Sequence, residues 1–175
     1  MKAIKFLVAA VAMAFAMNAN AEWKLDLGDG HFTVNANVGS YGPSTAGFGL
    51  GVAYQTEVFT CDWLSLDWDV LHFEWDAPFN SPGDSDALNF KTGARAYSPS
   101  FANDHLRAYS NLDLGYVLGI ASDGDETDAS SAFGLDWGIG IQLNKKWSFG
   151  YTLEFTKYKD VPGGKSHYAT VAYTF

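Results

Sequence analysis

The chain has 175 residues, with 11 Lys and Arg against 20 Asp and Glu, and a formal net charge of −9. This acidic balance argues against nucleic acid as a partner and against adhesion to anionic lipid through a basic patch. One cysteine and four histidines are too few for a disulfide framework or a Cys-rich metal site, so Cys61 is expected to be a free thiol near a turn.

Residues 1–21 have the features of a secretory signal peptide. Lys2 and Lys5 form a short basic region, and the apolar run from Phe6 to Met17 is too short to span a bilayer. Small residues precede Ala21, so we expect cleavage after Ala21 and one mature domain, residues 22–175. An uncleaved anchor helix is the alternative. The mature chain has no apolar stretch long enough for a transmembrane helix.

In the mature chain, apolar residues alternate with small or polar ones from Phe32 onward, which is the two-residue period of a β-strand. In the first half this pattern predicts strands near 32–39, 48–55, 64–75 and 88–97. The apolar phase of the third segment changes at Val70-Leu71, and this predicts a β-bulge there.

The second half alternates more regularly. It predicts strands near 111–120, 133–143, 147–156 and 169–175. The eight segments together have the lengths that tilted strands need to cross a bilayer.

The composition of the two phases separates a membrane barrel from a soluble one. The bulky apolar phase carries no charged residue, whereas the other phase is rich in Gly, Ser, Thr and Asn with a few charges. A soluble lipocalin-type barrel would need a charged outer phase. A small, Gly-rich phase instead suits the crowded interior of an eight-stranded barrel. We therefore predict an all-β fold: a closed, eight-stranded antiparallel transmembrane barrel, connected as an up-and-down meander.

The connections predict the orientation, because such barrels have short periplasmic turns and longer outward loops. Counted back from a periplasmic Phe175, the outward connections are 42–45, 76–86, 121–130 and 159–166, and the periplasmic ones are 55–62, 97–105 and 144–146. Aromatic residues then fall into two girdles, one at each membrane interface. The girdles comprise Tyr54, Trp147, Tyr173 and Phe175 on one side, and Phe48, Trp75, Phe133 and Phe155 on the other.

The alternating C-terminal segment, which contains Val171 and ends Tyr173-Thr174-Phe175, resembles the signal that outer-membrane proteins present to the barrel-assembly machinery. With the strand count and alternation, the whole mature chain resembles the small outer-membrane barrels of the OmpX type or the OmpA transmembrane domain. The resemblance implies an outer-membrane location, contact with membrane lipid and lipopolysaccharide, and a surface or structural role. An extracellular ligand or host surface is a further possible partner.

The inward phase carries charged residues that we expect to form a polar network plugging the lumen. They are Asp67, Asp69, Lys91, Arg95, Arg107, Asp113, Asp136 and Glu154. The alternatives are a narrow pore or a small-ligand carrier.

His72 and Glu74 share this phase, and a His beside a carboxylate can activate a Ser nucleophile. Lipid A deacylases are eight-stranded barrels with a Ser–His–Glu site at the outer rim, so a lipid A-modifying hydrolase is the enzymatic alternative. Their local His-x-Ser motif is missing from this sequence. A hydrogen-bonded histidine in a non-enzymatic protein is therefore the favoured interpretation.

No cofactor is expected, and no metal site is predicted. The acidic run Asp123, Asp125, Glu126 and Asp128 carries the oxygen ligands that Ca²⁺ prefers, but it lacks the rest of an EF-hand pattern. A solvated loop is the favoured interpretation. Loose divalent-cation binding that bridges lipopolysaccharide phosphates is the alternative.

Overall fold

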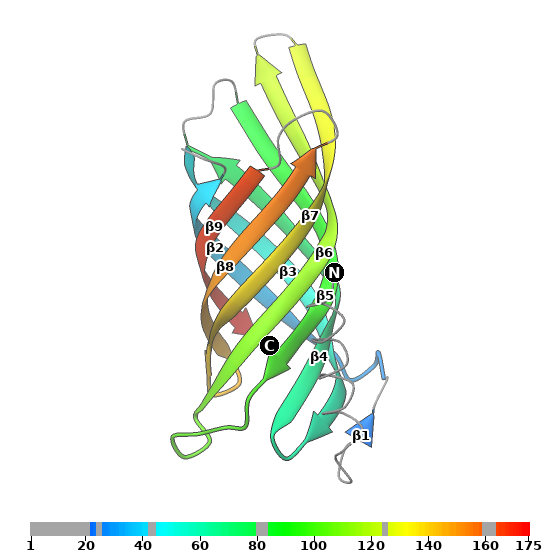
Figure 1. Ribbon diagram of the computed structural model, residues 1–175, viewed down its shortest axis with the longest axis vertical. Coiled ribbons are helices and arrows are strands. Elements are labelled where there is room, and N and C mark those ends of the chain that lie inside the picture. The colour runs from blue at the N-terminus through cyan, green and yellow to red at the C-terminus, as the bar shows by residue number, and fades with distance from the viewer. Residues whose placement is uncertain (1–21, 24–25, 42–44, 80–83, 124–125, 159–163) are drawn as a thin grey trace, which may run out of the picture.

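The computed structural model describes residues 22–23, 26–41, 45–79, 84–123, 126–158 and 164–175. Their strands are β1 (Glu22–Trp23), β2 (His31–Tyr41), β3 (Thr45–Cys61), β4 (Leu64–Pro78), β5 (Asp84–Tyr97), β6 (Leu106–Asp123), β7 (Glu126–Leu143), β8 (Trp147–Tyr158) and β9 (Gly164–Thr174). Each of β2 to β9 pairs antiparallel with its chain neighbours, and β9 pairs with β2. The sheet therefore closes into the predicted eight-stranded meander barrel (Figure 1).

Within the described residues, no helix is long and apolar enough to cross a membrane.

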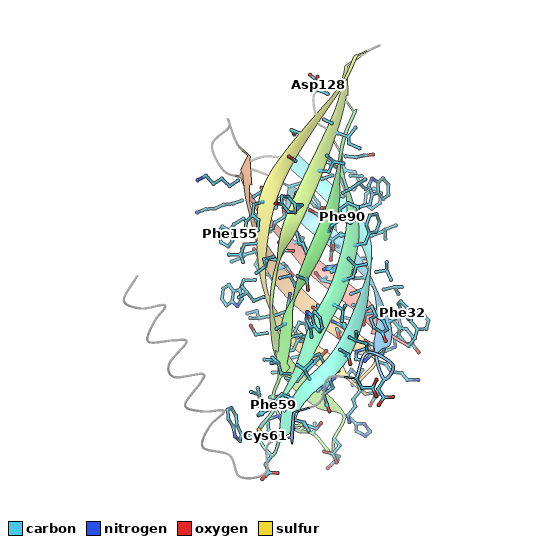
Figure 2. The ribbon with its side chains drawn as sticks, turned by 90° about the vertical axis from the view of Figure 1, so that its right-hand side faces the viewer. Phe32, Phe59, Cys61, Phe90, Asp128 and Phe155 are labelled. Atoms are coloured by element: carbon cyan, nitrogen blue, oxygen red, sulfur yellow. The ribbon has the colours of Figure 1, made fainter. Side chains whose placement is uncertain are left out.

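Side chains of the two phases separate cleanly across the barrel wall. On β6 to β8 the outward Leu114, Ile139 and Phe155 are 44, 50 and 39% exposed. Figure 2 shows Phe32, Phe90 and Phe155 on the outside of the wall. Charged and amide side chains one residue away are buried inside. An apolar exterior around a polar interior is the arrangement of a barrel in lipid, so the predicted phase assignment is confirmed.

Aromatic pairs occupy both ends of this exterior. At the end that carries Phe175, called here the Phe175 end, Tyr173 contacts Trp147 and Phe175 with ring centroids 4.9 and 5.1 Å apart. At the opposite end, called the hairpin end, Phe48 contacts Trp75 at 5.5 Å. These pairs place aromatic rings where two interfacial girdles require them.

The bulge predicted in the third segment is present. Tyr54 of β3 pairs with Leu71 and Gln55 pairs with Asp69, so Val70 has no partner on β3. A second register shift, between Glu57 and Phe59 in β3, was not predicted from the sequence.

Two predicted connections are wrong, because they are largely strand. Residues 55–61 continue β3, and only Asp62 and Trp63 form the turn to β4. Residues 121–130 belong mostly to β6 and β7, which stay paired out to Asp123 and Glu126. Their polar sequence indicated a loop, but beyond the membrane both faces of a hairpin meet water, and a strand there needs no apolar phase. This hairpin rises past the pairing of β7 with β8, which begins at Ala132 (Figure 1).

The connections at the Phe175 end are otherwise as expected. Residues 144–146 form a tight turn in which Asn144 and Lys145 have φ of 52° and 58°. Residues 26–30 lie against β3, where the Thr56 hydroxyl donates to the Asp26 carbonyl at 2.8 Å and the Tyr54 hydroxyl donates to the Leu27 carbonyl.

Replacing Ile139 by Arg should destabilise the barrel by about 2–4 kcal/mol, because a charge near the bilayer midplane loses its hydration. Urea unfolding in lipid vesicles measures the difference. Ala129→Arg is the matched control, since Ala129 points outward on the same strand but above the end of β8. Equal stability of the Ile139→Arg variant and the parent would mean that this face does not contact lipid.

Candidate functional site

The candidate site is the barrel lumen, which is lined with polar side chains. Seven acidic residues are at most 5% exposed there, whereas the inward-facing cations are Lys91, Arg95 and Arg107. The acids are Asp67, Asp69, Glu74, Asp76, Asp113, Asp136 and Glu154. In so small a volume each charge must find a partner or water, and the side chains divide into two clusters with a cavity between them.

Lys91, Asp136 and Glu154 form the first cluster, called here the Lys91 cluster. The Lys91 Nζ lies 2.7 Å from Asp136 Oδ2 and 2.6 Å from Glu154 Oε2, and its side chain is 2% exposed. The three residues come from β5, β7 and β8, so this contact reaches across the lumen rather than along one strand pair. The Tyr168 hydroxyl of β9 donates to Asp136 Oδ2 at 3.4 Å.

Glycine makes room for this lysine. A Cβ on Gly134 would stand 3.3 Å from Lys91 Cε and 2.9 Å from Val117 Cγ2. A side chain at this position would crowd Val117 and the lysine stem, and the absence of a Cβ leaves room for both.

The second cluster lies nearer the Phe175 end and is called the arginine cluster. Arg107 stacks on the Tyr97 ring at 3.5 Å, and its Nε donates to Gln142 Oε1 at 2.6 Å. Arg95 lies 5.0 Å above the Tyr109 ring, and its Nη2 is 3.9 Å from Asp69 Oδ2. Tyr97 is fully buried. Guanidinium groups stacked on aromatic rings are held in place by both charge and packing, so this cluster places two stacked cation–aromatic pairs across the lumen.

His72 and Glu74 lie between the two clusters. Glu74 Oε2 is 3.4 Å from His72 Nε2 and accepts a hydrogen bond of 2.8 Å from Asn35 Nδ2. The cavity beside them has a volume of about 30 Å³, which is room for one or two waters. The geometry therefore supplies a histidine and a carboxylate beside a small cavity, with no serine among its described lining residues.

The structure places all eight predicted network residues on the lumen side. Six of them, Asp67, Asp69, Lys91, Asp113, Asp136 and Glu154, are buried. It adds others that sequence reasoning missed, chiefly Asn35, Asp76, Tyr109 and Tyr168. Asp76, Tyr109 and Tyr168 stood just outside the predicted strands, and extending the alternation by a few residues would have found them.

The acidic run of residues 123–128 is only partly described. Of the acidic run, Asp125 lies outside the described residues, as do the side chains of Asp123 and Glu126, and Asp128 is exposed. Among the described residues, no group of three or more His, Cys, Asp or Glu is placed to hold a metal ion.

Val171 and Tyr173 face outward on β9, and Phe175 is 73% exposed at its end.

Replacing Lys91 by Met should destabilise the barrel by about 3–5 kcal/mol, because it leaves two carboxylates buried without their counter-charge. The triple variant Lys91→Met, Asp136→Asn, Glu154→Gln removes all three charges and should be more stable than the single variant. Unfolding in lipid vesicles compares them with the parent. If the single variant is as stable as the parent, the cluster does not hold the lumen together.

Comparisons with known proteins bear on the fold. No protein-family model matches the chain, and no curated protein matches it in sequence. Three similar solved structures are Neisserial surface protein A (TM-score 0.60, 16% identity, 83% of this chain and 97% of that one), the outer-membrane enzyme PagL (0.58, 16%, 82% and 98%) and the N-terminal barrel domain of Pseudomonas aeruginosa OprF (0.50, 13%, 83% and 97%). The chain therefore has the fold of the small eight-stranded outer-membrane β-barrels.

Proposed function

We propose that this chain is a non-enzymatic surface protein of the outer membrane, with a lumen closed to flow and a strand hairpin displayed outside the cell. The observation that carries the proposal is the pair of charged clusters that lies across the lumen. Lys91 reaches two carboxylates at hydrogen-bonding distance, and the stacked arginines occupy the section nearer the Phe175 end. The cavity between them, about 30 Å³, has no room for a hydrated ion in transit.

An enzymatic role has less support. The likeness to PagL is a likeness of fold, at 16% identity. His72 and Glu74 are the residues that a hydrolase would use here, yet both line the small interior cavity, in which no described residue is a serine. A hydrolase acting on membrane lipid needs its nucleophile where an acyl chain can reach it. We therefore assign His72 and Glu74 to the polar network.

The outward end is proposed to be the hairpin end. There β6 and β7 continue beyond the rest of the barrel, and Asp128, Ala129, Ser130 and Ser131 on β7 are exposed. Their polar, acidic surface suits contact with water and with a surface partner rather than with lipid. The proposal includes cleavage after Ala21 and recognition of Val171, Tyr173 and Phe175 by the assembly machinery.

Planar-bilayer recording tests the closed lumen. The purified protein should show no stepwise ion conductance, because the Lys91 and arginine clusters interrupt any continuous water path. A refolded porin in the same lipid serves as the positive control. Regular single-channel steps from the wild-type protein would contradict the proposal and favour the narrow-pore alternative.

Cysteine labelling in intact cells tests the orientation. Asp128→Cys in a Cys61→Ser background should react with a membrane-impermeant maleimide, because residue 128 is exposed on the hairpin. The native Cys61 provides the matched control, since it lies at the opposite end of the barrel (Figure 2). In wild-type cells it should react only after the outer membrane is permeabilised. The reverse pattern would place the hairpin in the periplasm.

A further inference from the structure

The barrel has a second, larger cavity at the hairpin end, called here the outer cavity. Its volume is about 300 Å³, at the lower limit of small-molecule sites. Its lining comes from seven of the eight barrel strands and includes Tyr41, Asp76, Val117, Glu154 and Thr156. Glu154 also contacts Lys91, so the outer cavity lies directly against the Lys91 cluster.

The outer cavity is acidic. Asp76, Asp86 and Glu154 line it, and none of its described lining residues is Lys or Arg. The nearest buried cation is Lys91, which is already held by Asp136 and Glu154. Asp76, 2% exposed, therefore has no basic partner among the described lining residues. Burial without a counter-charge favours the neutral carboxyl group, and a bound cation would favour the carboxylate instead.

The same region holds buried polar atoms that have no hydrogen-bond partner among the described residues. Asn89 Nδ2 donates to Asp76 Oδ2 at 2.5 Å, but Asp76 Oδ1 and Asn89 Oδ1 accept no hydrogen bond from the described residues. The Tyr41 hydroxyl also has no hydrogen-bond partner among them. A Cβ on Gly49 would collide with Asp76 Oδ1 and stand 2.9 Å from the Tyr41 hydroxyl, so these two groups lie over the same glycine. The unused oxygens are thus close together.

A protonated amine matches this combination. An ammonium group carries a positive charge and three N–H donors, and it has no acceptor of its own. A metal ion fits less well, because no described group of three or more His, Cys, Asp or Glu residues is placed to hold one. We infer that the outer cavity binds a small organic cation with a primary ammonium group, which Asp76 receives with Asn89 and Tyr41 beside it.

Nuclear magnetic resonance of the wild-type protein in lipid nanodiscs tests this inference, with 1,4-diaminobutane as the probe. The diamine should shift the amide signals of residues around the outer cavity, including Val117 and Thr156, while 1,4-butanediol should not. Asp76→Asn should weaken binding about tenfold or more, the loss expected for a hydrogen bond to a charged group. Asp128→Asn removes an exposed acid of the hairpin and should leave binding unchanged.

Tetramethylammonium separates donor recognition from general attraction of cations, and it needs no variant that must fold. It carries the charge without any N–H, so it should bind much more weakly than the diamine. Equal binding of the two cations, equal loss in both Asn variants, or no shift around the cavity at millimolar diamine would each overturn the inference.

Discussion

The structure depends on one constraint: inside a bilayer every backbone N–H and C=O must be paired within the protein. The chain meets it by closing eight strands into a ring, with β9 paired to β2, so that each of the described barrel strands has a partner on both sides. The two-residue period of the sequence follows from this closure, since every strand then has one face in lipid and one in the lumen. Above the membrane the constraint ends, and there β6 and β7 continue as a hairpin with polar residues on both faces.

Closing only eight strands makes the interior narrow, and its contents must fit as well as neutralise one another. Lys91 shows both requirements together. It neutralises Asp136 and Glu154 from across the lumen, and it does so through space that Gly134 leaves open. Nearer the Phe175 end, the Arg107 guanidinium stacks on the Tyr97 ring. These two flat groups fit the narrow lumen, and Arg107 supplies positive charge. Neutralisation is uneven, however, because acids predominate toward the hairpin end.

Most of the fold could be predicted from the sequence, because alternation is a local pattern that a lipid-facing strand must display. The strand count, the phase and the bulge at Val70 all followed from it. Strand ends could not be predicted, since outside the bilayer the alternation is no longer required, and residues 121–130 were assigned to a loop for that reason. From the sequence, the lumen contacts could be predicted only as a set of inward-facing residues, without their partners. Which of them meet depends on register and tilt, and so the partners of Lys91 and the acidic surplus at Asp76 needed the structure.

The extra residue at Val70 determines what half of β4 contributes to the protein. Before it, Asp67 and Asp69 point inward; after it, His72, Glu74 and Asp76 do so, although they lie at even rather than odd positions. The bulge at Val70 thus changes which of the two alternating sets of side chains points inward. The same strand paired regularly, with no bulge at Val70, would turn these three polar groups toward hydrocarbon and bring Phe73 and Trp75 into the lumen. The chemistry of the hairpin end therefore depends on a local irregularity in strand pairing, at a residue that takes no part in that chemistry.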